Sequence, residues 1–370
     1  MAQQYNETEA LNVPSSGTYG EYDILDFMIT GDMDSDLVAN SVLLTGTIEV
    51  REPSTDRVAA KQVFFDPDCG MHAFIDNCTV SSVLGQHEHI GEYSRFVKMH
   101  EMAKGENSKF NSKSVNSLQS SSADTSNAYC NGDISAGTGA TNHTIKDQDF
   151  AVYPKCCLNR GSGNIAFKKV QYVKLSITLN KVLSSLYTNE ATPTMNYILS
   201  DVKLSYKTQA TQNQQSVMKS VVGIKQSINS SMANISAKVP AVCDSMSANF
   251  LLQSSENSAT KNGQRLDRLP NVDSVQFLFN DSITNNFISY ALEDQGEMVQ
   301  QAIESLNAGS DHNVLNSDYW KGPNYVLGLN WKQAIDLSAR KFNVQIRSSG
   351  GIDNTTPYLA YLYFNTQVVI

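Results

Sequence analysis

The sequence predicts an all-β protein made of two tandem antiparallel jelly-roll β-sandwiches, with short helices and long loop insertions. Two observations predict this fold class. Several short segments alternate between apolar and polar residues with a period of two, as strands with one buried face do. The order of these segments recurs in the second half of the 370-residue chain, which indicates a duplicated unit.

The composition agrees with two β-rich domains. Hydrophobic residues make up 41% of the chain and charged residues only 18%, so sizeable cores can be buried. Most of the remaining polarity comes from Ser, Asn, Thr and Gln, which are typical of turns and strand faces. Helix-rich chains use Glu, Lys and Ala instead.

In the first half, residues 44–50 and 74–80 alternate as strands would. Apolar residues then recur with helical spacing over 93–100, and Gly105 is a suitable residue to end a helix. Residues 106–147 are polar with almost no apolar periodicity, so we expect a long surface loop there.

Alternation returns over residues 173–179, where apolar and polar side chains occupy opposite faces, and again over 198–206. A loop containing Thr192-Pro193 separates these two strands. The Gln-rich segment that follows indicates a connection between domains.

The second half repeats this plan. Residues 275–279 alternate, 298–306 have helical spacing that ends before Gly309, and a loop is expected over 310–324. Three closing strands are expected at 325–331, 342–347 and 358–370, with Thr356-Pro357 where Thr192-Pro193 stands in the first half. The continuous apolar stretch Tyr358–Phe364 is typical of an inner strand.

We therefore expect four segments. They are a flexible N-terminal arm over residues 1–20, an N-terminal jelly roll over 21–207, a linker over 208–220 and a C-terminal jelly roll over 221–370. Among sandwich folds, jelly rolls are best suited to large loop insertions.

The charge pattern excludes a broad nucleic-acid surface. The net charge is −9, and neither a Lys/Arg cluster nor a basic arm is present, although phosphate binding needs clustered positive charge. The six cysteines form no C-x-x-C pair and are expected to be free thiols in a protein assembled inside the cell. No signal peptide and no membrane-spanning run is predicted.

One cluster of possible metal ligands occurs, at His87-Glu88-His89, with Cys69 and His72 upstream. In a strand, the two histidines of the triplet would share a face, as a zinc site requires. The favoured interpretation is a polar turn between a strand and the helix, so no metal, cofactor or catalytic residue is predicted.

Two acidic segments also have a structural explanation. Asp66-Pro67-Asp68 and Asp311-His312 are typical of turns, where Asp accepts backbone hydrogen bonds. The motifs of hydrolase nucleophiles, phosphate loops, zinc proteases and dinucleotide binding are absent from the sequence.

Four aromatic residues lie close together in the second half, namely Tyr319, Trp320, Tyr325 and Trp331. They are interpreted as core or subunit interface ahead of a carbohydrate-binding surface.

Two segments resemble the double jelly-roll capsid proteins of tailless icosahedral DNA viruses, a group that includes adenovirus hexon and the major capsid proteins of membrane-containing phages, virophages and Polinton-like viruses. The first is YVLGLNWKQAIDLSARKFNVQIRSSGGIDNTTPYLAYLYFNTQVVI, which is similar to the closing strands of such a subunit. The second is GMHAFIDNCTVSSVLGQHEHIGEYSRFVKM, which is similar to a strand, loop and helix of these proteins. Together they cover roughly a quarter of the chain.

The resemblance implies a non-enzymatic capsid protein of the virion, assembled inside the host cell. It implies homotrimers of pseudo-hexagonal outline that self-assemble with neighbouring capsomers, and with minor capsid or penton proteins, into an icosahedral shell. Residues 106–147 and 310–324 would form towers on the outer face, and residues 1–20 would tie subunits together or touch an inner membrane. The host receptor is not indicated.

Three alternatives stay open on the sequence. One is a penton or minor capsid protein. Another is a receptor- or glycan-binding β-sandwich, such as a spike or adhesin, that uses the aromatic cluster. The last is an enzyme on a β scaffold with a metal bound by His72, His87 and His89.

Overall fold

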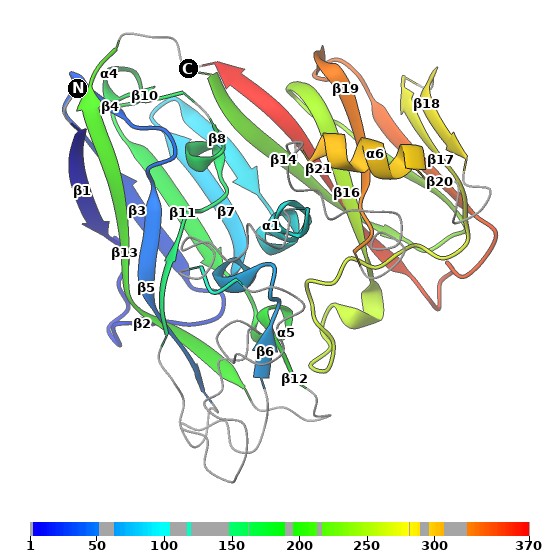
Figure 1. Ribbon diagram of the computed structural model, residues 1–370, viewed down its shortest axis with the longest axis horizontal. Helices are drawn as coiled ribbons and strands as arrows, with labels where there is room; N and C mark the ends of the chain where they lie inside the picture. Colours follow the sequence, from blue (N-terminus) through cyan, green and yellow to red (C-terminus); the bar gives the residue numbers. More distant parts are fainter. Residues whose placement is uncertain are drawn as a thin grey trace.

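A computed structural model places two jelly-roll sandwiches next to each other, one from each half of the chain (Figure 1). The structure describes residues 3–51, 63–103, 117–119, 148–161, 163–188, 195–212, 217–280, 282–288, 296–306 and 324–369. The predicted all-β class and double jelly roll are confirmed.

The first jelly roll contains strands β1 to β13. Their bounds are β1 Gln3–Glu9, β2 Thr18–Tyr19, β3 Ile24–Ile29, β4 Ser35–Leu37, β5 Leu43–Arg51, β6 Val63–Phe65, β7 Ile75–Ser82, β8 Gly85–Ile90, β9 Gln148–Val152, β10 Ile165–Ala166, β11 Val173–Leu179, β12 Leu186–Thr188 and β13 Asn196–Ala210. The helices among them are α1 Tyr93–Met102, α4 Phe167–Val170 and α5 Val182–Ser185, with 3-10 turns at Gly70–Phe74 and Cys157–Asn159.

The second jelly roll contains strands β14 to β21. Their bounds are β14 Val217–Ile228, β15 Met232–Ala237, β16 Val242–Leu252, β17 Val272–Phe279, β18 Ser282–Ile288, β19 Leu327–Asp336, β20 Phe342–Ser348 and β21 Tyr358–Val369. Helix α6 Gly296–Ser305 lies between β18 and β19, and a 3-10 turn at Gln253–Ser255 follows β16.

The two halves have the same strand order, which confirms the duplication that the sequence indicated. The first jelly roll pairs its strands as β1–β13–β5–β9 and β3–β11–β7–β8. The second pairs them as β14–β21–β16–β19 and β15–β20–β17–β18. Helices α1 and α6 occupy the same place in the chain order, directly after β8 and β18.

Alternating sequence segments became strands where the prediction put them. The alternation over Val173–Leu179 is β11, whose apolar side chains are buried at every second position. The apolar stretch near the C-terminus is in β21, which lies between β14 and β16 and is buried from Leu359 to Thr366, as an inner strand requires.

The expectation of a flexible arm over residues 1–20 was wrong for its first part. Gln3–Glu9 pairs along its whole length with β13 and is the first strand of the first jelly roll. Sequence patterns did not reveal this strand, because it carries no apolar alternation and most of its side chains are exposed. Backbone hydrogen bonding to β13 holds such a polar strand in place.

The expected linker is also shorter than predicted. Residues 208–210 continue β13, and residues 217–220 begin β14. The predicted helix near residue 93 is confirmed as α1. Most of the predicted loop over 106–147, and residues 310–323 of the second loop, lie outside the described residues. No described helix is long and apolar enough to cross a membrane.

Candidate functional site at the junction of the two jelly rolls

The two jelly rolls share a sheet. Strand β8 of the first meets β14 of the second in a parallel bridge between His89 and Val222, so eight strands form one continuous sheet in the order β19–β16–β21–β14–β8–β7–β11–β3. Edge-to-edge pairing of this kind removes two exposed strand edges at once. The shared sheet therefore joins the two jelly rolls at this point, and the polar contacts around it contribute to the stability of the junction.

Helix α1 fills the space beside this sheet. Nine of its ten residues are buried. The helix packs on its own jelly roll and also on strands β21 and β16 of the second jelly roll, on the sheet face turned away from that jelly roll's core. The Phe96 ring lies 5.3 Å from the Tyr363 ring, and the Tyr363 hydroxyl donates to the backbone oxygen of Glu92 at 3.0 Å. The helix that the apolar spacing predicted is thus part of the contact between domains.

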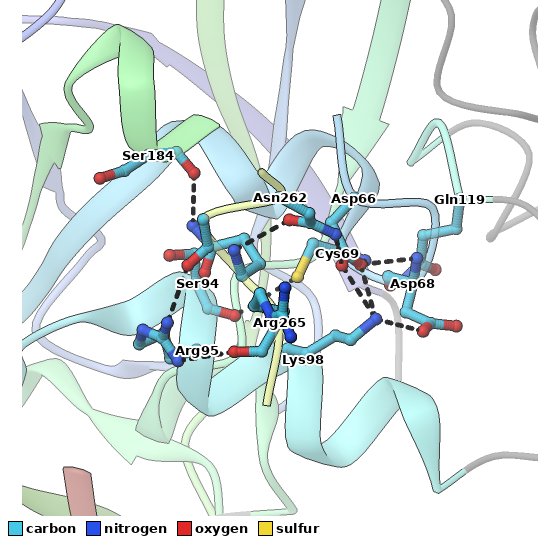
Figure 2. Close-up of polar contacts among 12 residues, drawn as sticks. Asp66, Asp68, Cys69, Ser94, Arg95, Lys98, Gln119, Ser184, Asn262 and Arg265 are labelled. Atoms are coloured by element: carbon cyan, nitrogen blue, oxygen red, sulfur yellow. Dashed lines mark hydrogen bonds and ion pairs between the residues drawn. The ribbon is translucent and has the colours of Figure 1, made fainter. Parts of the chain in front are cut away.

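Arg95 of α1 reaches into the second jelly roll (Figure 2). Its guanidinium donates to the backbone oxygen of Gly263 at 2.8 Å and to that of Arg265 at 3.2 Å. It also donates to Asn249 Oδ1 at 3.2 Å and lies 4.5 Å from the centre of the Tyr361 ring. Charged donors of this kind form strong hydrogen bonds and satisfy carbonyls that burial has removed from water.

Gly263 is required where it stands. A Cβ atom at this position would lie 2.9 Å from the backbone oxygen of Ser184 and 3.0 Å from its Cα. The loop after β16 therefore touches the backbone of the first jelly roll at a distance that a side chain would prevent.

Lys98, one turn further along α1, lies in a buried acidic site drawn in Figure 2. Its Nζ is 2.9 Å from Asp66 Oδ2 and 2.5 Å from Asp68 Oδ2. Burial would lower the pKa of Lys98, but Asp66 and Asp68 outweigh burial and hold that pKa well above its usual value. Asn262 of the second jelly roll donates to Asp66 Oδ2 at 2.6 Å, so this site also joins the two domains.

The turn predicted at Asp66-Pro67-Asp68 is confirmed. Asp66 Oδ1 accepts the backbone N–H groups of Asp68 at 2.9 Å and Cys69 at 3.0 Å. The ion pairs to Lys98 were not predicted, because nothing in the local sequence indicates that a residue some thirty positions away is buried beside the turn.

The polar turn expected at His87-Glu88-His89 was wrong, because these residues belong to β8. The two histidines share a face, as strand spacing requires, but each is hydrogen-bonded to a hydroxyl of β7. His87 Nε2 is 2.6 Å from Ser82 Oγ, and His89 Nδ1 is 2.8 Å from Thr79 Oγ1.

His72 and Cys69 lie outside β8. His72 is hydrogen-bonded to the Tyr93 hydroxyl, and the Cys69 thiol is hydrogen-bonded to the backbone oxygen of Ser94. The possible ligands therefore do not converge on one point. Across the described parts of the chain, no group of three His, Cys, Asp or Glu side chains is arranged to hold a metal ion.

The Glu88 side chain lies on the opposite face of β8 from His87 and His89, and it is fully buried at the junction. Its carboxylate accepts the backbone N–H of Val221 in β14 at 2.8 Å and the N–H of Cys157. Arg160 is 3.7 Å away, and its other nitrogen donates to Asn365 of β21 at 2.7 Å. Burial raises the pKa of Glu88 to about 7, and the neighbouring Arg160 only partly offsets this.

The aromatic cluster is divided by the structure. Tyr325 is buried and Trp331 is half-buried, packed 5.7 Å from the Phe279 ring and 5.6 Å from the Phe342 ring. These two residues belong to the second core, as the favoured interpretation expected. Tyr319, Trp320 and Asp311-His312 lie outside the described residues.

A cavity of about 740 Å³ opens between the jelly rolls near the end of α1. It is lined by charged and amide groups of both halves, including Glu101, Arg160, Asp244 and Gln367. Lys155 forms an ion pair with Glu101 at its wall. Gln367 also donates to Asp244 Oδ2 at 3.4 Å, so several of the lining groups pair with one another.

Comparisons with known proteins agree with this architecture. No model of a known protein family matches the chain, and neither does any curated protein sequence. Among solved structures, the Faustovirus major capsid protein is similar with a TM-score of 0.66 and 9% identity, over 100% of this chain and 90% of that protein.

Two further structures are similar over nearly their full length. VP54 of PBCV-1, as fitted into a reconstruction of the virophage Sputnik, has a TM-score of 0.59 and 10% identity, covering 100% of this chain and 94% of that one. The mavirus major capsid protein has a TM-score of 0.50 and 10% identity, covering 98% and 92%. The chain therefore has the double jelly-roll fold of these viral major capsid proteins.

Proposed function

We propose that this protein is a structural capsid subunit that self-assembles, as pseudo-hexagonal trimers, into the icosahedral shell of a virion. The observation that carries the proposal is the junction, where two sandwiches of equal strand order are held as one block by a shared sheet and by buried polar contacts. A block of two like units, repeated three times, supplies six similar sides. The likeness to capsid proteins over the whole chain supports the same role.

The proposed partners are other copies of this chain, neighbouring capsomers and minor capsid or penton proteins. An inner membrane on the genome side fits the net charge of −9, which does not favour direct contact with nucleic acid over a wide surface. No catalytic role is part of the proposal, and the buried cations Arg95, Lys98 and Arg160 each bind groups of the protein itself.

The penton or minor capsid role is the second candidate, because the fold of one chain does not separate it from the hexagonal capsomer. A glycan-binding role is less well supported, since Tyr325 and Trp331 pack into the second core.

The experiment that tests the proposal is the mass and shape of the purified protein, by size exclusion with light scattering and then negative-stain imaging. A particle of three 40.7 kDa chains with a hexagonal outline, or closed shells, is the expected result. A pentamer would move the assignment to a penton. A stable monomer at all concentrations would overturn the capsid role.

A further inference from the structure

The cavity between the two jelly rolls plays no part in the proposed capsid role. Its volume of about 740 Å³ lies within the range of cavities that bind small molecules, roughly 300–1,000 Å³. Helix α1 and the segment 153–160 line it from the first jelly roll, and strands β14, β16 and β21 line it from the second. Polar and charged side chains predominate on the wall, so the ligand it suits is held by charge and hydrogen bonds.

Arg160 is the least exposed cation among the described residues of the wall, with 15% of its side chain exposed against 24% for Lys155. Its Nη2 donates to Asn365 Oδ1 at 2.7 Å, and the guanidinium lies 4.9 Å from the centre of the Phe96 ring. Its Nη1 is buried and has no hydrogen-bond acceptor among the described residues, since Glu88 Oε1 is 3.7 Å away. An anionic oxygen bound in the cavity would satisfy this donor.

The carboxylates that act on Arg160 balance its charge only in part. Glu88 of β8 already accepts two backbone N–H groups, and its pKa of about 7 leaves it mostly protonated below that pH. Asp244 of β16 accepts from Ser245 Oγ at 2.8 Å and from Gln367 Nε2 at 3.4 Å. Burial lowers the pKa of Arg160 in spite of both carboxylates, so they do not fully compensate for the loss of water.

Lys219 of β14 adds a second cation to this part of the wall. Its Nζ lies 3.9 Å from the point where a Cβ atom of Gly161, the residue after Arg160, would stand. The third cation, Lys155, forms an ion pair with Glu101. These two charges cancel, so Arg160 and Lys219 share one remaining carboxylate and the described wall carries one net positive charge.

We propose that the cavity binds a small dianionic oxyanion of the phosphate or sulfate class, held between Arg160 of the first jelly roll and Lys219 of the second. A guanidinium binds such an oxyanion through parallel hydrogen bonds, and the lysine supplies a second positive charge. His72 and His100 of the same wall add positive charge when protonated.

The site joins the two halves of the chain, because its two cations come from different jelly rolls. An oxyanion bound to both stabilises the junction, since it binds only while the two jelly rolls are in place. The inference does not depend on the proposed capsid role.

The test is isothermal titration calorimetry of the full-length protein with sodium sulfate, while chloride keeps the ionic strength constant. The pH is about 6, where the Glu88 carboxyl is mostly protonated. The variants are Arg160→Gln and Lys219→Gln. The matched control is Lys203→Gln, which removes the same charge from an exposed position of β13 outside the cavity wall. Circular dichroism verifies that each variant is folded.

The unaltered protein and the Lys203→Gln control are expected to bind one sulfate per chain with equal affinity. Each cavity variant is expected to bind sulfate about tenfold more weakly or worse, since a hydrogen bond to a charged group contributes at least that much. Lys219 is exposed, so its replacement leaves the core intact and keeps the test decisive if Arg160→Gln does not fold.

A second titration, with glycerol phosphate, distinguishes two sources of the oxyanion. Tighter binding than that of sulfate supports an organic phosphate as the ligand, and equal or weaker binding supports a free inorganic ion.

The absence of saturable sulfate binding, or binding that the folded cavity variants leave unchanged, would overturn the inference. The capsid role is tested separately by the mass and shape of the particle, so the failure of one proposal is distinguishable from the failure of the other.

Discussion

At the scale of single residues, the junction depends on buried charges that are matched across distant parts of the chain. Lys98 is the clearest case, since its side chain is 7% exposed and its two partners, Asp66 and Asp68, are 0% and 3% exposed. Charges removed from water to this extent are tolerated only when each has a partner.

The substitution Lys98→Met is therefore expected to lower the free energy of unfolding by roughly 3 kcal/mol, because it leaves two carboxylates buried without their cation. The matched control is Lys225→Met, whose ion pairs to Glu92 and Glu256 are much more exposed and should cost less than about 1 kcal/mol. Denaturant midpoints of the three proteins measure the difference. Equal losses for the two variants would contradict the assignment of Lys98 as a buried pair.

Glu88 gives the junction a pH dependence. Its pKa is raised in the folded protein from the ordinary value of 4.5 to about 7, so the folded state binds the proton more tightly than the unfolded state. The stabilisation from this group is therefore complete below pH 4.5 and is lost as the pH rises through 7. The size of the effect is up to roughly 3 kcal/mol.

The Glu88→Gln variant removes this titration. We expect the stability of the unaltered protein to fall relative to the variant between about pH 5 and pH 7, as the carboxylate ionises in its buried site. Thermal melts across this range measure it. A stability difference that is constant with pH would show that Glu88 keeps an ordinary pKa.

At the scale of elements, α1 and α6 hold the same place in the strand order but differ in how much of each helix is buried. Helix α1 is enclosed between the jelly rolls, whereas α6 packs on β19 of its own jelly roll and leaves a polar face open. Close packing of α6 depends on Gly328, where a Cβ atom would overlap Ser305 Oγ and lie 2.7 Å from the Cα of Ala302.

The substitution Gly328→Ala is expected to destabilise the protein by about 1–3 kcal/mol, because the added methyl group forces α6 away from β19. Gly296→Ala is the control, since nothing lies within 4 Å of a Cβ there and the new side chain meets open space. Melting temperatures distinguish the two. A Gly328→Ala protein as stable as the control would mean that α6 is loosely held.

At the scale of the whole molecule, duplication gives two jelly rolls with the same strand order. The bridge between β8 and β14 joins the two jelly rolls into one eight-stranded sheet within the chain. Within the described residues, β1 at one end of the molecule and β18 at the other each pair along one side (Figure 1).

The sequence by itself determined the strand content, the helix at α1, the inner position of β21 and the repeated plan, because alternation and helical spacing report which face of a segment is buried. It missed β1, whose polar side chains carry no such alternation, and it took β8 for a turn. Only the tertiary structure decided the junction. Arg95 and Gly263 are 168 positions apart, and no local pattern records which buried charge meets which carbonyl once two sandwiches pack together.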